Sequence, residues 1–382
     1  MKYTQLRSVA AISVCVFIVL LGISYVSGQD IWEAKGATAD IGETAYLVKA
    51  ETDIITEADE AAEETSDSTK ESGIPQESEM TGLAANIIIP KMLEGIEVTL
   101  EDEYINRQLK VKIANAPEGI YQKEMLIYDG KAVEKVAVEY PGKDKTVFVV
   151  SLDGVYAYEL TEKEDMYVVT LRDIHSVYEK VIVVDAGHGG KDNGCSSPDS
   201  KQYEKKITLA VTEELKALLD NTDIKVYYTR LRDETVYLRP RVSLANDVKA
   251  DMFISLHCNF YEYYYYYKVK GAEALYSSAR KKVAGKSKRL SAILLDNMVA
   301  ETGLSKRSVV DRKKDIHILK KSRVPATIVE MAYLSEAGDL KYISGKNGQK
   351  TIAKGLFNGI VETYHTLYNK TIETFENGDN NK

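Results

Sequence analysis

The stretch Val181-Ile-Val-Val-Asp-Ala-Gly-His-Gly-Gly190 decides the fold of the C-terminal half, because an apolar run breaks there into glycines at a histidine. Two further apolar runs end in comparable side chains, Met252-Phe-Ile-Ser-Leu-His257 and Ala326-Thr-Ile-Val-Glu330. Short continuous apolar runs are typical of strands buried on both faces of a parallel sheet. Open α/β sheets place their chemistry at the carboxyl edge of the strands, so we expect one site there.

Helical patterns alternate with these runs. One predicted helix opens at Glu204 and the last one ends the domain; their apolar faces are Ile207, Val211, Leu215 and Leu218, and Ile352, Leu356, Ile360, Tyr364 and Leu367. A further strand is expected at Lys225–Thr229. The alternation predicts an α/β domain over residues 180–370, with a parallel-type sheet flanked by helices.

Residues 83–178 have a different period. Short alternating or apolar runs lie at Ile96–Leu100, Leu109–Ile113, Thr146–Val150, Val155–Leu160 and Met166–Leu171. Turn signals such as Asp129-Gly130 and Asp153-Gly154 separate them. This pattern predicts a small β-rich, sandwich-like domain. It carries no catalytic constellation, so a binding or spacer role is its default interpretation.

The N-terminus predicts export. Lys2 and Arg7 precede an uncharged apolar run, Val9–Val26, so residues 1–28 read as a signal peptide or a single-pass membrane anchor. Small residues at Ser27 and Gly28 favour cleavage by signal peptidase. The run is also just long enough to span a bilayer, in which case the N-terminus keeps its membrane contact. Both alternatives place the remainder outside the cytoplasmic membrane.

Residues 29–82 read as an acidic linker. Glu51–Glu79 holds eleven acidic residues and one lysine, a composition that predicts disorder. The formal net charge of the 382-residue chain is −8, so the remainder outside that stretch is near +2. Nothing in this balance indicates a nucleic-acid-binding protein.

The chain has three cysteines, Cys15, Cys195 and Cys258, which exclude a disulfide framework. Cys15 lies in the apolar N-terminal run. A bridge between the other two stays open as an alternative, although two free thiols are the favoured interpretation.

The chemistry of the candidate site comes from His188, Glu204, His257 and Glu330. A hydrolytic zinc site needs three protein ligands and one open position for water, and two histidines with a glutamate form such a set. A carboxylate such as Glu330, in an otherwise apolar segment, suits a general base because burial raises its pKa. The competing interpretations are helix-terminus stabilisation by Glu204 and a salt bridge from Glu330 to Arg230 or Arg241.

The remaining ionisable candidates have weaker contexts. His175 and His365 are expected on the surface. His317 alternates with apolar residues in Asp315-Ile-His-Ile-Leu319, so it is a candidate to face the site. Glu213 and Glu214 compete with Glu204 but lie several turns from the strand edge.

Six ordered pieces resemble the zinc-dependent N-acetylmuramoyl-L-alanine amidases of the amidase type 3 family, over about Lys180 to Tyr368. They are Val181–Gly194, Glu204–Ala210, Tyr228-Thr-Arg230, Arg241–Asn246, Asp251–Asn259 and Pro325–Glu330. The resemblance implies a peptidoglycan hydrolase that cleaves the amide between N-acetylmuramic acid and the L-alanine of the stem peptide. It implies one Zn²⁺ held by His188, Glu204 and His257, with Glu330 as the catalytic acid–base.

The same resemblance gives Asn259 as a candidate substrate contact, with turn capping as the alternative, and places the protein in the cell wall. It is expected to be either secreted or anchored to the outer face of the bacterial cytoplasmic membrane. The β-rich domain stands where some family members carry a wall-targeting domain. Arg230 and Arg241 are expected to be structural ion-pairing residues.

Three departures from the family pattern bear on the prediction. Ala186 stands where proline is usual, and Cys258 replaces a small residue, with its side chain expected to face away from the metal. Tyr261–Tyr267 replaces small polar residues and is either a glycan-contact loop or a merely ordered or self-associating one. An expected strand, 271–276, and helix, 281–301, take up much of the segment between His257 and Glu330, so no inhibitory plug is expected.

Two other functions stay open: a non-catalytic wall-binding or regulatory protein, and a zinc peptidase that acts within the stem peptide. Stem-peptide preference, oligomeric state and physiological stage have no signal in the sequence.

Overall fold

A computed structural model describes residues 82–263, 268–313 and 315–375. The predicted signal or anchor segment, the acidic linker up to residue 81 and the tyrosines at 264–267 lie outside these described ranges. Among the helices that are described, none has both the length and the apolarity needed to cross a membrane.

The β-rich region contains two four-stranded antiparallel sheets, ordered β4-β1-β8-β7 and β2-β3-β6-β5. Their strands are β1 (Leu83–Pro90), β2 (Glu97–Glu103), β3 (Gln108–Ala114), β4 (Ile127–Tyr128), β5 (Val133–Gly142), β6 (Lys145–Leu152), β7 (Ala157–Glu162) and β8 (Met166–Arg172). Short 3₁₀ turns, η1 (Tyr104–Asn106) and η2 (Lys123–Met125), interrupt the connections. All five expected runs are strands, whereas β1, β4 and β5 were not anticipated.

One apolar core is shared by these two sheets. Alternate residues of β1, β3, β6 and β8 are buried in it, including Ile87, Val111, Phe148 and Val169. The inward alternation explains the period-2 pattern of the sequence, since successive side chains of a strand point to opposite faces. The sandwich-like expectation for this region is therefore confirmed.

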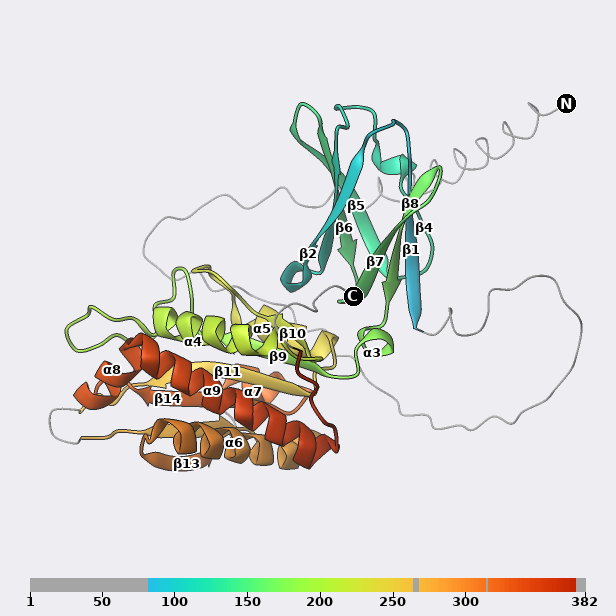
Figure 1. Cartoon of the computed structure of the whole chain (residues 1–382). Coiled ribbons are helices and arrows are strands. Elements are labelled where there is room, and N and C mark those ends of the chain that lie inside the picture. The colour runs from blue at the N-terminus through green and yellow to red at the C-terminus, as the bar shows by residue number, and fades with distance from the viewer. Residues whose placement is uncertain (1–81, 264–267, 314, 376–382) are drawn as a thin grey trace, which may run out of the picture. The chain divides into compact units, whose positions relative to one another are not determined.

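The C-terminal region is an α/β layer structure built on a six-stranded sheet, ordered β10-β9-β11-β14-β12-β13 (Figure 1). Its strands are β9 (Val181–Ala186), β10 (Lys225–Tyr228), β11 (Met252–Asn259), β12 (Ala272–Tyr276), β13 (Lys306–Asp311) and β14 (Ala326–Tyr333). Its helices are α4 (Glu204–Leu219), α5 (Leu238–Asp247), α6 (Lys281–Thr302), α7 (His317–Lys321), α8 (Ala337–Ser344) and α9 (Lys346–Thr363). A short helix α3 (Ile174–Val177) precedes the domain, and a π-helical turn η3 (Tyr364–Tyr368) follows α9.

The sheet is parallel except at one pairing. Strands β10, β9, β11 and β14 run parallel, whereas β12 pairs antiparallel with β14 and parallel with β13. Between β11 and β12 the described residues form no crossover helix, so the chain returns in the opposite direction. The predicted parallel-type sheet is thus observed with two reversed strands, β12 and β13.

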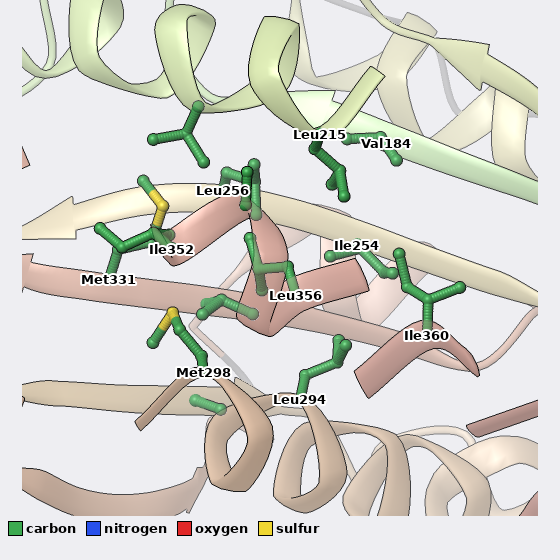
Figure 2. Close-up of a cluster of buried hydrophobic side chains, with 14 of the residues drawn as sticks. Val184, Leu215, Ile254, Leu256, Leu294, Met298, Met331, Ile352, Leu356 and Ile360 are labelled. Carbon is green, nitrogen blue, oxygen red and sulfur yellow. The ribbon is translucent and has the colours of Figure 1, made fainter. Parts of the chain in front are cut away.

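Helices cover both faces of this sheet. Helices α4, α6 and α9 pack on one face over a large apolar cluster that includes Val184, Leu256 and Met331 from the strands (Figure 2). Helices α5 and α7 cover the other face around Phe253 and Ile328. The expected apolar faces of α4 and α9 are buried in the first cluster, apart from the partly buried Leu218 and Leu367.

Glycine sets the approach of α9 to α6. A β-carbon at Gly355 would lie 2.6 Å from the Cα atom of Met298, and one at Gly359 would lie 2.8 Å from a methyl carbon of Leu294. The two helices can therefore pack closely only because these positions have no side chain. This packing fixes the layer beneath β11 and β14, whose carboxyl ends carry the site.

Candidate metal centre and active site

His188 lies just past the carboxyl end of β9, in a backbone conformation that is unusual for its residue type. Its φ is 61°, in the left-handed region, which costs of the order of 1 kcal/mol for a non-glycine residue. Before it, Gly187 is required because a β-carbon there would lie 2.6 Å from the His257 ring. The turn that the glycines of the sequence predicted therefore brings the two imidazoles together.

Two buried arginines hold this turn from below. Arg241 donates from Nη2 to the His188 carbonyl at 2.6 Å. Arg230 donates to the carbonyls of Ala186 and Gly187 at 2.9 and 2.8 Å. Charge-assisted hydrogen bonds of this kind are stronger than neutral ones, so they stabilise the strained backbone.

Glu204 is the first residue of α4, and its side chain is only 2% exposed. One carboxylate oxygen, Oε2, accepts the backbone N–H of Cys195 at 2.8 Å, and Oε1 accepts that of Cys258 at 2.9 Å. The same oxygens face His188 Nε2 at 3.1 Å and His257 Nδ1 at 2.9 Å. Stabilisation of the helix terminus is therefore an insufficient account of this residue, because its carboxylate faces away from its own helix toward two imidazoles.

His188, Glu204 and His257 form a candidate metal site: each offers a ligand atom, and these atoms all lie within 4.8 Å of one another. Two imidazole nitrogens and a carboxylate oxygen form a donor set suited to zinc. The other ring nitrogen of His188, Nδ1, lies 2.8 Å from Asp192 Oδ2. Such an outer carboxylate orients a ligating imidazole and fixes its tautomer.

The electrostatics of these three residues reflect their mutual contact. Burial opposes the charged form of His257, but the Glu204 carboxylate outweighs it and raises the pKa of His257 to about 9. For His188, burial likewise lowers the pKa and Glu204 raises it, and the net pKa is raised. Burial alone would raise the pKa of Glu204, yet the two histidines hold it far below its usual range. The cluster is thus built to hold positive charge beside the carboxylate.

Glu330 lies on β14 directly opposite His257 of β11 in the sheet register. Its Oε2 is buried and has no hydrogen-bond partner among the described residues. Burial raises the pKa of Glu330 to about 7, with a further upward contribution from Glu204. A desolvated carboxylate that titrates near neutrality beside a metal site has the properties of a general base.

The salt-bridge interpretation of Glu330 is wrong. Arg241 forms an ion pair with Asp185, at 2.5 Å from Nη1 to Oδ1. Arg230 donates to backbone carbonyls and to Thr208 Oγ1. The expected structural ion pair therefore exists for Arg241, while Arg230 is structural without an ion pair among the described residues.

Asp185 is the charged residue inside the first apolar run, and it is fully buried. Besides Arg241, Thr229 Oγ1 donates to Oδ1 at 2.5 Å and Ser255 Oγ donates to Oδ2 at 2.6 Å. Burial would raise the pKa of this carboxyl, but Arg241 and the two hydroxyls lower it. Asp185 therefore links β9 to Ser255 of β11, to Thr229 and to Arg241 beneath the site.

Asn259, the candidate substrate contact, belongs to a second polar network. Its Nδ2 donates to Glu273 Oε1 at 2.5 Å and to the Tyr333 hydroxyl at 3.2 Å, and Oδ1 accepts the N–H of Phe260 at 2.8 Å. Glu273 lies directly opposite Glu330 in the β12–β14 pairing. Sequence reasoning missed Glu273, because only the reversed direction of β12 brings it there.

A cleft of about 320 Å³ opens beside the metal residues. His188 and His257 line it together with Tyr237, which precedes α5, and Leu238, the first residue of α5; these last two are 74% and 56% exposed. Ile318 lines the cleft, whereas its neighbour His317 is exposed at the start of α7 and is not a lining residue. Tyr237 was missed because no local pattern marks it.

The other sequence expectations near the site are met. His175 and His365 are exposed, and Cys195 and Cys258 are free thiols. Cys258 packs in the apolar cluster on the α4, α6 and α9 face, away from the metal residues. Helix α6, which lies between His257 and Glu330 in the chain, packs into that same cluster, so it does not cover the site.

Comparisons with known proteins agree with this geometry. The family model for N-acetylmuramoyl-L-alanine amidase (Amidase_3) matches residues 182–362. The protein YqiI of Bacillus subtilis is 26% identical over 185 residues, which cover 48% of this chain and 85% of YqiI. The probable cell wall amidase LytH of Staphylococcus saprophyticus is 30% identical over 183 residues, covering 48% of this chain and 57% of LytH.

Among solved structures, the catalytic domain of CwlV, an N-acetylmuramoyl-L-alanine amidase from Paenibacillus polymyxa, is 30% identical. The match covers 48% of this chain and 97% of that domain, with a TM-score of 0.44. Over its C-terminal half this chain spans less than two thirds of LytH but nearly all of the CwlV domain. By the family model, residues 182–362 of this chain are a domain of the N-acetylmuramoyl-L-alanine amidase family, Amidase_3.

Proposed function

We propose that this protein hydrolyses the amide bond between N-acetylmuramic acid and the L-alanine of the peptidoglycan stem peptide. The observation that carries the proposal is the convergence of His188, Glu204 and His257 on one point, with the unpartnered carboxylate of Glu330 on the neighbouring strand. The membership of residues 182–362 in the amidase family supplies the substrate class.

In this proposal His188, Glu204 and His257 hold one Zn²⁺. The donor atoms are close enough to share one ion, and the backbone N–H groups that bind Glu204 keep its carboxylate aimed at both imidazoles. Zn²⁺, when bound, supplies Lewis-acid activation of water and stabilises negative charge on the scissile carbonyl oxygen.

Glu330 moves the proton. Its carboxylate accepts a proton from the attacking water and delivers it to the leaving nitrogen of L-alanine, so the amine departs uncharged. The absence of a hydrogen-bond partner on Oε2 among the described residues supports this role, because that oxygen is free to accept. Asn259 is proposed to act on substrate indirectly, through Glu273 and Tyr333, while a substrate role for His317 remains a proposal from the sequence.

Cell wall amidases act outside the cytoplasmic membrane, so we place this chain there, secreted or held by residues 1–28. The division into an acidic linker at 29–82, a wall-targeting or spacer domain at 83–178 and a catalytic domain at 180–370 is part of the same proposal.

Digestion of purified peptidoglycan by the full chain, with and without a zinc chelator, tests the function. Chelator-sensitive release of stem peptides with a free N-terminal alanine, read by mass spectrometry, is expected. Cleavage within the stem would identify a zinc peptidase instead. Intact glycan–peptide links with folded, zinc-loaded protein would leave a wall-binding protein.

Replacing Glu204 with glutamine is expected to weaken zinc binding at least about 100-fold. Loss of a residue that only hydrogen-bonds a metal ligand already lowers metal affinity by about 10- to 100-fold, and loss of a ligand should lower it further. The carboxylate charge that holds both histidines is removed, while the side-chain shape is kept. Zinc content after dialysis and the dissociation constant give the measurement. Glu213→Gln, on the exposed side of the same helix, is the matched control; zinc loss in both variants would contradict a specific ligand role.

Activity is expected to fall as the pH drops through the pKa of Glu330. A general base works only when deprotonated, so kcat/KM decreases about tenfold per pH unit below that pKa and levels off above it. Burial raises the pKa from 4.5 to about 7, and a bound dication lowers it from there. A profile of kcat/KM measured from about pH 4 to about pH 8 should therefore fall on its acid side with an apparent pKa between 4.5 and about 7. An identical limb in Glu330→Gln would assign it to another group.

A further inference from the structure

A row of charged side chains crosses four neighbouring strands of the C-terminal sheet. The register pairs His257 of β11 with Glu330 of β14, and Glu330 with Glu273 of β12. Beyond Glu273, β13 brings Arg307 alongside, at 4.0 Å from Nε to Glu273 Oε2. Directly opposite residues in paired strands share a face, so the row starts at the metal residues and leads to the sheet edge.

Alternation along β11, β14 and β12 assigns His257, Glu330 and Glu273 to the face away from α6. The neighbours Cys258, Ala272 and Met331 pack in the apolar cluster under α4, α6 and α9. On β13, Lys306 faces α6, where it pairs with Asp296, and the ladder shifts register just beyond it, so Arg307 is placed by its contact with Glu273. Arg307 therefore stands on the same surface as Glu330.

The position of Arg307 is set by groups that are themselves fixed. Glu273 is 13% exposed, and its Oε1 accepts hydrogen bonds from Asn259 Nδ2 at 2.5 Å and from the Tyr333 hydroxyl at 3.1 Å. The guanidinium carbon of Arg307 lies 5.4 Å from the centre of the Tyr333 ring, a cation–π distance. One carboxylate oxygen and one aromatic face thus hold the guanidinium in place.

Most of the hydrogen-bonding capacity of Arg307 is nevertheless unused. A guanidinium has five N–H donors, and its contact with Glu273 at 4.0 Å is longer than a hydrogen bond. Within the described part of the chain no acceptor lies in hydrogen-bond range of it, and its side chain is 39% exposed. A positioned, half-exposed guanidinium with free donors is suited to a carboxylate that arrives from solution.

The spacing fits a peptide that leaves the cleaved bond along this row. Neighbouring strands are about 4.8 Å apart, so β13 lies about 10 Å from β14. An extended peptide covers about 3.4 Å per residue, and Arg307 reaches back toward Glu273, so its guanidinium is about two residues from Glu330. Without the positive charge of Arg307, an acidic peptide lying along this row would be repelled by the carboxylates of Glu330 and Glu273.

We propose that Arg307 is the specificity-determining residue of a stem-peptide subsite, where it binds the free α-carboxylate of the second stem residue, a γ-linked D-glutamate. The proposal rests on the proposed amidase function and adds a direction to it: the peptide runs from Glu330 over Glu273 toward β13.

The test compares two muramoyl-tripeptides that differ only in whether the second residue has a free α-carboxylate or its amide. The full-length, zinc-loaded protein is expected to show a kcat/KM about tenfold higher for the carboxylate form. In Arg307→Gln the two substrates should become equal, mainly through KM for the carboxylate form. Arg307→Lys should keep part of the preference, because it retains the charge without the planar fork.

Lys306→Gln is the matched control, since it removes the same charge from the adjacent position of β13 on the opposite face. It should retain the substrate preference of the unmodified chain. An equal rate on both substrates in the unmodified chain, or a preference that survives in Arg307→Gln, would overturn the subsite.

Binding of the free tripeptide and its amidated form, measured by calorimetry, separates this proposal from the amidase function. If neither muramoyl-peptide is cleaved, the function fails. The subsite then stands only if the unmodified protein binds the carboxylate peptide more tightly and Arg307→Gln does not. If both substrates are cleaved and neither peptide is preferred, the function stands and the subsite fails.

Discussion

Replacing Glu330 with glutamine is expected to lower kcat about 10²- to 10⁴-fold, the range for loss of a positioned acid–base group. Glutamine keeps the shape of the side chain but cannot accept the proton of the attacking water. The fold should be unaffected, because Glu330 Oε2 makes no hydrogen bond to described residues and the neighbouring Glu273 is a like charge. Rates of stem-peptide release, zinc content and thermal melting are the measurements.

The zinc content is decisive for interpreting this variant. Loss of activity with one zinc per chain retained assigns the defect to proton transfer, whereas loss of both assigns it to the metal site. Glu213→Gln, on the exposed face of α4, should leave all three measurements unchanged. If Glu330→Gln hydrolyses the substrate within a few-fold of the normal rate, Glu330 is not the general base.

Replacing Asp185 with asparagine is expected to lower the free energy of unfolding by about 3–5 kcal/mol, as for breaking a buried ion pair from one side. The Arg241 guanidinium would stay buried without its counter-ion, and Thr229 Oγ1 and Ser255 Oγ would lose a charged acceptor. Because the pKa of Asp185 is lowered in the folded state, this stabilisation is present above the ordinary value of 3.8 and is lost as pH falls below it.

Urea unfolding of the zinc-free protein at neutral pH measures the effect without a contribution from bound metal. Asp220→Asn is the matched control: it breaks a pair with Lys216 whose side chains are 36% and 49% exposed, and it should cost no more than about 1 kcal/mol. A loss of that small size in Asp185→Asn would mean that the network beneath the turn carries little of the stability.

The sequence predicted the parts of the site that depend on local pattern. His188, His257 and Glu330 each follow or end an apolar run, so burial and position at the sheet edge could both be inferred. The position of Glu204 at the start of an amphipathic helix fitted helix-terminus stabilisation as well, and only the resemblance to the amidases assigned it to the metal. The structure brings these residues together because parallel strands end at one edge.

Features that depend on strand neighbours could not be predicted in the same way. Glu273 lies opposite Glu330, and Arg307 lies beside Glu273, only because β12 runs antiparallel to β14 and pairs with β13. Alternation along a strand fixes the face of a side chain but not its neighbour. Asp185 was visible as a charge inside an apolar run, yet its partner Arg241 lies 56 residues away on helix α5. No local pattern gives such a pairing, because it is set by how the helices cover the sheet.

The support of the His188 turn by Arg230 and Arg241 bears on how the protein behaves without a bound metal. The three carbonyls of residues 186–188 are held by guanidinium groups of the protein itself, independently of any ion. Removal of the metal therefore need not collapse the turn. For the proposed zinc hydrolase, chelation is therefore expected to be a reversible pause instead of a route to degradation.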